Sequence, residues 1–192
     1  MKDNYLDVVD KVKLLGVTIT NDLKWNDNTA DLVKRANARL ELLRKVAVFS
    51  NSLEDKKLIY TLYIRSILEQ SCVVWHSSLT IENSDDLERI QKCAFKIILG
   101  QKYQNYEKAL EIMDLETLKD RRTQLCIVFA KKCLENEKTK QMFPIQTKCY
   151  ETMLRNENKF VVNHANTARY YKSPIPYMQR LLNNEKEDNT PG

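Results

Sequence analysis

Glycine is scarce in this sequence, and its scarcity constrains the fold more than any other feature. The 192 residues include three glycines, Gly16, Gly100 and Gly192, whereas an average chain of this length carries about thirteen. Glycine adopts positive φ angles more readily than any other residue, and the tight turns between strands often need such angles. We therefore expect a mainly α protein rather than a turn-rich all-β one.

Composition and charge are those of an ordinary globular chain. The length allows a core to be buried without disulfides. There are 31 lysines and arginines against 26 aspartates and glutamates, which gives a net charge of +5. That charge is too small to indicate nucleic-acid binding by itself. The five cysteines form no CxxC pair, so the sequence predicts neither a disulfide framework nor a zinc site.

Two further observations bear on the cellular compartment. The longest apolar run is Leu125–Ala130, far shorter than the roughly 20 residues of a membrane-spanning helix. Asp3, Asp7 and Asp10 stand where a signal peptide would need a basic start and an apolar middle. We therefore expect an intracellular protein that does not bind membranes.

The first 20 residues alternate between apolar and polar side chains, as strands do. We expect one β-hairpin, with strands at Tyr5–Val9 and Val12–Ile19 and a turn at Asp10 and Lys11. A two-stranded hairpin is only marginally stable alone. It is therefore expected either to lie on the helices or to belong to a sheet whose other strands are not in this chain.

Helical periodicity follows the hairpin and weakens after Phe143. The last part of the chain, with its prolines and tyrosines, is expected to be a partly ordered extended strap that ends in a disordered tail. The expected fold is thus a hairpin, a bundle of about five helices and an extended C-terminal tail. The expected helices are 29–48, 52–75 with a cap at Ser52, 85–99 with a cap at Ser84, 106–113 with a cap at Asn105, and 117–137.

Basic side chains on two of these helices are candidates for contacts with a phosphate backbone. Arg35 and Arg39 lie four residues apart, on one edge of the first helix. Residues 117–140 contain seven basic and three acidic residues. A solvated helix face is the commoner role for both groups. The candidates on the long helix are Arg121, Arg122, Lys131 and Lys132.

The C-terminal segment mixes aromatic and basic residues. Arg169 and Lys172, together with Tyr170, Tyr171 and Tyr177, have the chemistry to contact phosphates and stack on unpaired bases. The alternative, which we favour, is a strap across the helices with half-buried tyrosines.

Patterns typical of catalytic sites are missing from the sequence. Asp85 and Asp86 are adjacent acids that could resemble a metal-binding pair, but they follow Ser84 at a predicted helix start, where acids complement the helix dipole. His76 and His164 are far apart, and no P-loop or nucleophile elbow is present. We expect no catalytic residue, no bound metal and no cofactor.

An ordered series of short motifs resembles the end of the palm and the following region of reverse transcriptases from non-LTR retrotransposons, the LINE-like, Jockey-related elements. Each motif is weak alone, whereas the ordered set, over about residues 11–183, is specific. The motifs are Lys13–Ile19, Leu23–Trp25, Ala36–Leu40, Leu43–Lys45, Tyr63–Glu69, Val74–His76, Leu87–Lys92, Lys96–Gly100, Leu115–Leu118, Arg121–Arg122, Phe129–Lys132, Phe143–Pro144, Arg169–Tyr170, Lys172–Tyr177 and Leu181–Asn183.

The resemblance implies a division of the chain and a set of partners. Residues 1–25 would be a palm-end hairpin, 26–140 the thumb and post-thumb helices, 141–182 the strap and 183–192 the tail. The thumb of such a polymerase holds RNA, RNA–DNA or DNA duplex through phosphates, which adds Arg44 and Lys45 to the candidates. The catalytic aspartates and their Mg²⁺ would belong to the missing palm, a further partner, and the location would be nuclear.

Three interpretations therefore remain. The first is a reverse-transcriptase fragment, not an enzyme, that keeps nucleic-acid contacts. The second is a helical protein-interaction module derived from such an element, without nucleic-acid binding. The third is one part of an active RNA-directed DNA polymerase, which needs the palm in the same chain or in trans.

Overall fold

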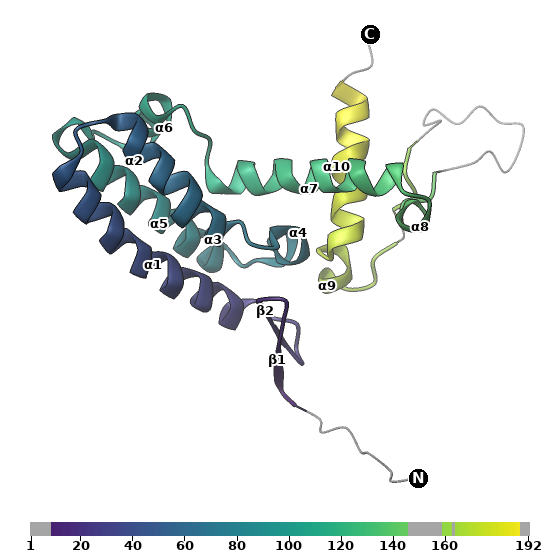
Figure 1. The fold of residues 1–192 in the computed structure, drawn as a ribbon. Coiled ribbons are helices and arrows are strands. Elements are labelled where there is room, and N and C mark those ends of the chain that lie inside the picture. The colour runs from purple at the N-terminus through teal and green to yellow at the C-terminus, as the bar shows by residue number, and fades with distance from the viewer. Residues whose placement is uncertain (1–8, 146–158, 163, 189–192) are drawn as a thin grey trace, which may run out of the picture. The chain divides into compact units, whose positions relative to one another are not determined.

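The computed structural model describes residues 9–145, 159–162 and 164–188. The chain divides into two compact units. The first unit runs to Ser71 and includes Leu79–Leu118, and the second contains Cys72–Ser78 and the residues from Lys119 onward. Helices predominate in the ribbon of Figure 1, so the mainly α fold class is confirmed.

In the first unit the helical segments follow an N-terminal hairpin, and each unit is formed by two separate stretches of the chain. The first unit contains β1 (Lys11–Leu14), β2 (Val17–Thr20), α1 (Asn26–Phe49), α2 (Leu53–Ile59), the π-helical segment η1 (Tyr60–Arg65), α3 (Ser66–Leu68), α5 (Ile81–Leu99), the 3₁₀ turn η3 (Gly100–Lys102) and α6 (Tyr106–Met113). The second contains α4 (Cys72–Trp75), the 3₁₀ turn η2 (His76–Ser78), α7 (Leu118–Glu135, whose first residue belongs to the first unit), α8 (Glu137–Lys140), α9 (Ala168–Tyr171) and α10 (Pro174–Asp188).

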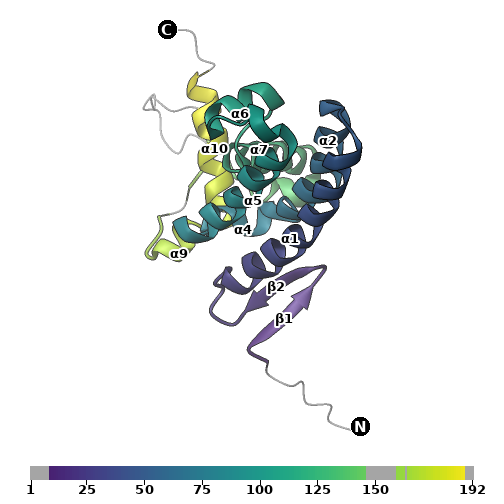
Figure 2. The same ribbon diagram turned by 90° about the vertical axis from the view of Figure 1, so that its left-hand side faces the viewer.

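The predicted hairpin is present, with its turn at Leu15 and Gly16 (Figure 2). β1 and β2 are antiparallel, and Leu14 lies opposite Val17. Leu15 and Gly16 both have positive φ angles, 49° and 85°, as the central residues of a type I′ turn do. The turn therefore forms where a glycine can adopt this backbone conformation.

The predicted boundaries of the hairpin were wrong because the turn forms at Leu15 and Gly16. Asp10 and Lys11 do not form the turn, since Lys11 is the first residue of β1 and pairs with Thr20. Of the predicted first strand, Tyr5–Val9, all but its last residue lies outside the described residues.

Leu15 is a strained position, and its replacement by asparagine should stabilise the first unit. The leucine side chain is 90% exposed, so little apolar burial is lost, while asparagine tolerates positive φ better than leucine does. We expect Leu15→Asn to raise the free energy of unfolding by about 0.5 kcal/mol, as measured by urea denaturation followed through Trp25 fluorescence. Leu14→Asn, one residue earlier in the strand, should destabilise; the idea fails if Leu15→Asn does so too.

The hairpin is tied to α1 by polar contacts. The backbone N–H of Thr18 donates to Asn28 Oδ1 at 3.1 Å, so the outer edge of β2 has a partner there. Two lysines of β1 pair with acids in the first turns of α1. These ion pairs are Lys11–Asp27 at 3.4 Å and Lys13–Asp31 at 3.3 Å.

The opposite face of the hairpin is apolar and only partly covered. The register places Val12, Leu14, Val17 and Ile19 on that face. Val17 is buried, whereas Val12 and Leu14 are 51% and 58% exposed. Within the described residues no strand pairs with the outer edge of β1. This edge and this face can therefore accept further structure.

The helix α1 buries a single stripe of side chains. It begins at Asn26, three residues before the predicted start, directly after the buried Trp25. Leu32, Ala36, Leu40 and Leu43 are buried, as their spacing predicted. The helix thus packs through one side, mainly against α5.

The next helical segment is capped as predicted but ends earlier. Ser52 Oγ accepts a hydrogen bond from the backbone N–H of Asp55 at 3.2 Å. The segment passes through η1 and stops at Leu68 rather than Trp75, since Ser71 has a positive φ of 51°. Its buried side chains are Tyr60, Ile64 and Leu68.

The cap of α5 differs from the prediction. Thr80, not Ser84, receives the capping hydrogen bond, from the N–H of Asn83 at 3.1 Å. Asp85 and Asp86 consequently lie within the helix, where Asp86 pairs with Arg89 at 2.5 Å. At the other end Gly100 has the expected positive φ, 53°.

A buried network of polar side chains joins α5 to its neighbours. The hydroxyl of Tyr60 donates to Gln91 Oε1, and Gln91 Nε2 donates to Tyr106 Oη at 2.8 Å and to the carbonyl of Glu116 at 2.9 Å. Tyr106 donates in turn to Glu88. Burial, and then the carboxylate of Glu88, raise the pKa of Tyr106. Every member has a partner, so the network specifies one packing of these segments.

The second unit is built around one apolar cluster. Cys126, Ala130 and Cys133 of α7 pack with Met178 and Leu182 of α10, and two phenylalanines complete the cluster. The rings of Phe143 and Phe160 meet edge to face, with centroids 6.3 Å apart.

The helix α10 corrects the prediction of an extended C-terminal tail. Residues Pro174–Asp188 are helical, although both prolines suggested an extended strap. A proline in the first helical turn removes only an N–H that has no partner within the helix. Met178 and Leu182, four residues apart, then form a buried stripe. Of the predicted disordered tail, 189–192 lie outside the described residues.

The compact units differ from the four predicted segments. The predicted helical domain, residues 26–140, contributes to both units, and the change of unit along α7 comes between Leu118 and Lys119. Within the described part of the chain, no helix combines the length and the apolar character that crossing a membrane requires.

Candidate nucleic-acid interface

The predicted basic edge of α1 is partly occupied by other contacts. Arg35 Nε pairs with Asp31 Oδ2 at 3.1 Å, and its Nη2 donates to Gln70 Oε1 at 2.9 Å. Arg39 is exposed and has no hydrogen bond or ion pair to the described residues. On the same side of the helix lie Leu42 and Phe49, 39% and 89% exposed. This edge is therefore more apolar than basic.

The four α1 candidates do not share one face. Arg35 and Arg44 are nine residues apart, which is two and a half turns, so they lie on opposite sides of the helix. Lys45 and the unpredicted Lys34 are eleven residues apart, about three turns, and lie in one line on the solvent side. Arg44 and Lys45 are exposed, and Arg44 pairs with Glu41. The exposed cations on the solvent side of α1 are thus Lys34, Arg44 and Lys45.

Arg122 is not an exposed phosphate contact, so its prediction was wrong. Its exposed fraction is 0%. Apolar spacing predicts that Leu118, Leu125, Val128, Phe129 and Cys133 face inward on this helix, but Val128 and Phe129 are 48% and 42% exposed. The buried stripe of α7 is instead Leu118, Arg122, Cys126, Ala130 and Cys133.

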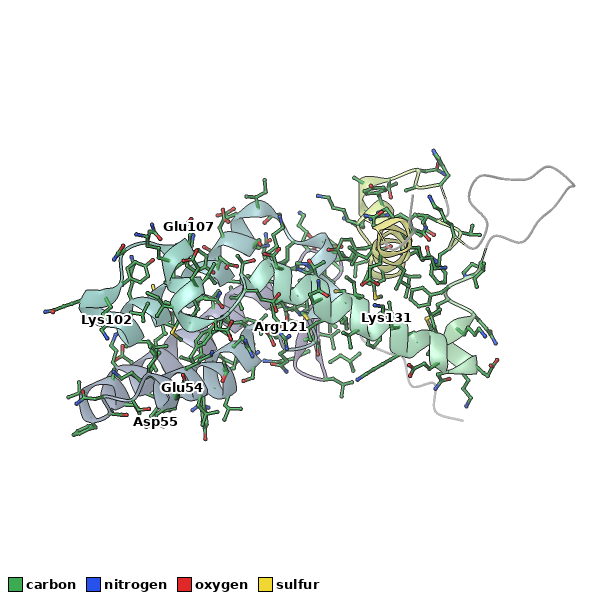
Figure 3. The ribbon with its side chains drawn as sticks, turned by 90° about the horizontal axis from the view of Figure 1, so that it is seen from above. Glu54, Asp55, Lys102, Glu107, Arg121 and Lys131 are labelled. Carbon is green, nitrogen blue, oxygen red and sulfur yellow. The ribbon has the colours of Figure 1, made fainter. Side chains whose placement is uncertain are left out.

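The other candidates on α7 are accessible to different degrees. Arg121 and Lys131 are labelled along this helix in Figure 3. Arg121 is half-buried. Lys131 pairs with Glu185 Oε2 of α10 at 2.9 Å, which neutralises part of its charge. Lys132 is exposed, so it is the most available cation of the four predicted here.

Arg122 is instead the centre of a buried polar group in the second unit. Its Nε donates to His76 Nδ1 at 3.3 Å, and its guanidinium carbon lies 5.9 Å from the ring centroid of Trp75. His76 Nε2 lies 3.2 Å from Thr123 Oγ1, which lies 3.4 Å from the hydroxyl of Tyr177. These contacts link five side chains from α4, η2, α7 and α10 into one continuous group.

The partners of His76 determine its protonation. An arginine can only donate, so Nδ1 must be the unprotonated acceptor. Nε2 therefore carries the hydrogen and donates the hydrogen bond to Thr123 Oγ1. Burial, and then the positive charges of Arg122 and Lys119, lower the pKa of His76 to about 4. The imidazole is therefore neutral at physiological pH, and the group serves structure rather than charge recognition.

The C-terminal candidates lie on and beside α9. Arg169 and Lys172 are exposed, and Tyr170 and Tyr171 are 41% and 51% exposed. Arg180 lies over the Tyr171 ring, 3.8 Å from its centroid. One face of Tyr171 is thus occupied, which leaves Tyr170 as the better stacking surface for a base.

Two sets of residues escaped the sequence-based reasoning. No local pattern predicts that Trp75 and His76 are buried beside Arg122, and their burial explains why a basic residue lies in the α7 stripe. The spacing of Lys34 and Lys45 was a visible signal of a shared face. Among the described residues no three histidine, cysteine or acidic side chains are grouped closely enough to hold a metal ion.

Comparison of the chain with protein-family models, with curated proteins and with solved structures found no match.

Proposed function

We propose that this chain is a non-catalytic fragment of a retrotransposon RNA-directed DNA polymerase that holds primer–template duplex through its phosphates. The proposal rests on the ordered motif resemblance, and the observation that carries it is the accessible cationic set of α1. Lys34, Arg44 and Lys45 contact solvent along one helix, which suits a backbone contact that does not distinguish bases. The location would be nuclear.

The hairpin supports the fragment part of the proposal. Its outer β1 edge has no strand partner among the described residues, and its apolar face leaves Val12 and Leu14 more than half exposed. Both features suit the end of a larger sheet, which here would be the palm of the polymerase. The palm would also supply the catalytic aspartates and Mg²⁺, so we expect no primer extension by this chain alone.

Removing two α1 cations tests the duplex contact. In Arg44→Ala/Lys45→Ala two phosphate contacts are lost, so duplex affinity should fall about 10-fold or more at low salt. The slope of log affinity against log salt should become shallower by about 2. Fluorescence anisotropy with a labelled RNA–DNA duplex measures both quantities.

A charge-matched control is available in the same unit. Lys102→Ala/Lys108→Ala removes two exposed lysines that are not on α1, and its duplex affinity should stay within about 2-fold of wild type. Equal losses in the two double variants would show that only net charge matters, and would contradict a contact surface on α1.

A protein-interaction module remains the second candidate. It is favoured by the large apolar side chains exposed on α1 and on the helical segment after it, among which Phe49 is 89% exposed. Such a module predicts a defined protein partner and no duplex binding.

A further inference from the structure

The short helix α9 carries four exposed side chains of two kinds. Arg169 and Lys172 are cations, and Tyr170 and Tyr171 are 41% and 51% exposed. We call these four residues the α9 surface. In Figures 1 and 2, α9 lies at the N-terminal end of α10, within the second unit. The α9 surface therefore shares no residue with the cationic set of α1.

The stretch of chain that contains the α9 surface is positively charged throughout. Between Glu157 and Glu185 the sequence has four lysines and arginines and no acidic residue. Arg169 and Lys172 form no ion pair with the described residues. Both charges are therefore available to an anion from outside the chain.

Hydrogen bonds hold α9 in one position. Thr167 Oγ1 accepts from the backbone N–H of Tyr170 at 3.1 Å, and the hydroxyl of Ser173 donates to the carbonyl of Tyr170 at 2.7 Å. The hydroxyl of Ser78 in η2 donates to the carbonyl of Lys172 at 2.8 Å, which ties the end of α9 to another stretch of the same unit. The exposed side chains project from an anchored backbone, so a ligand need not order that backbone in order to bind.

The two tyrosine rings differ in what covers them. Arg180 covers one face of Tyr171, with its guanidinium carbon 3.8 Å from the ring centroid, and its Nη2 donates to the carbonyl of Tyr171 at 2.7 Å. The side chain of Tyr170 has no ring contact and no hydrogen bond with the described residues. An exposed aromatic ring beside cations that contact phosphates is the arrangement on which proteins stack unpaired bases.

The spacing on α9 brings the two kinds of contact within reach of one strand. Arg169 and Lys172 are three residues apart, so they are neighbours on the helix surface, with about 5–6 Å between their Cβ atoms. Tyr170 lies about 100° around the helix from Arg169. Two phosphate contacts and one stacking contact thus lie side by side.

We propose that the α9 surface binds single-stranded nucleic acid, with Arg169 and Lys172 on neighbouring phosphates and a base stacked on Tyr170. The faces of the bases in a duplex are covered by their neighbours, so a duplex does not use the tyrosine. An acidic peptide would need the two cations alone. Tyr170 is therefore the residue that distinguishes a single strand from these other ligands.

Fluorescence anisotropy of the full-length chain with labelled oligouridine of about 12 nucleotides tests the stacking contact. Oligothymidine of the same length shows whether RNA or DNA is bound more tightly. Tyr170→Ala should weaken single-strand affinity about 10-fold, whereas Tyr170→Phe should bind as wild type does, because the ring stacks and the hydroxyl has no partner. Tyr63→Ala is the matched control, since Tyr63 is an exposed tyrosine of the first unit; it should leave the affinity unchanged.

Removing the two cations tests the phosphate contacts. In Arg169→Ala/Lys172→Ala the slope of log affinity against log salt should become shallower by about 1.4, because each phosphate contact on a single strand contributes about 0.7. Lys102→Ala/Lys108→Ala, which removes two exposed lysines of the first unit, should leave the slope unchanged.

The outcomes are independent of the proposed duplex contact. Tyr170→Ala should leave affinity for the RNA–DNA duplex unchanged, so either site can fail while the other holds. No binding to either single strand at low salt, or equal affinities of wild type and Tyr170→Ala, would overturn the proposal. So would a loss in Tyr170→Phe as large as that in Tyr170→Ala, or an unchanged salt slope in Arg169→Ala/Lys172→Ala.

Discussion

Replacing Arg122 by alanine should lower the free energy of unfolding of the second unit by about 3–5 kcal/mol. The side chain is fully buried, donates to His76 and lies over Trp75. Its removal leaves a large cavity and takes the donor from His76 Nδ1, and both effects destabilise the unit. The loss is large because neither water nor a neighbouring chain segment can replace a guanidinium in a closed core.

Tryptophan fluorescence can follow this loss in one unit at a time. The chain has two tryptophans, Trp25 in the first unit and Trp75 in the second. In a Trp25→Phe background, urea unfolding reported by Trp75 measures the second unit. Lys132→Ala, an exposed change on the same helix, should shift stability by no more than about 0.5 kcal/mol. An equally small effect of Arg122→Ala would refute the buried role.

Acidification should destabilise the second unit through His76. The pKa of this imidazole is about 4 in the folded chain and about 6.5 in an unfolded one. Between these two values the unfolded chain binds more protons than the folded chain, so stability falls as the pH falls from 6.5 to 4. The difference of about 2.5 pKa units corresponds to a loss of about 3 kcal/mol.

The contribution of His76 can be separated from that of the carboxylates. In His76→Gln, an amide replaces the imidazole and does not titrate, so the stability advantage of wild type over this variant should shrink by about 3 kcal/mol between pH 7 and pH 4. An NMR titration of the two histidines measures the pKa directly. A His76 midpoint near 6.5 would contradict the buried, arginine-facing environment.

Local signals in the sequence predicted much of the first unit. The caps at Ser52 and Asn105 were right because a cap is a contact between residues three apart, Asn105 Oδ1 accepting from Lys108 N at 2.8 Å. The stripe of α1 was right because the spacing from Leu32 to Leu43 is regular over about three turns. The hairpin turn was misplaced because Gly16 was assigned to a strand, although it is the residue that allows positive φ.

Other features depend on tertiary packing, which periodicity alone does not determine. Arg121 and Arg122 differ by one residue, or about 100° around the helix, and that rotation separates a half-buried position from a fully buried one. A charged residue in a stripe looks like a break in the pattern unless its partners are known. Here the partners, Trp75 and His76, are more than 40 positions away.

The C-terminal helix was predicted wrongly for a local reason rather than because of tertiary packing. Pro174 and Pro176 suggested extended backbone, but both fit the first turn of α10. Met178 and Leu182, four residues apart, have the spacing of a helical stripe, and both are buried in α10.

Binding of the full-length chain to duplexes of several unrelated sequences, measured against salt, tests the central claim most directly. If Lys34, Arg44 and Lys45 each contact one phosphate, affinity should fall about 40-fold between 50 and 200 mM salt, equally for all sequences. No binding at the lower salt concentration, or an affinity that does not change with salt, would contradict a duplex-holding function.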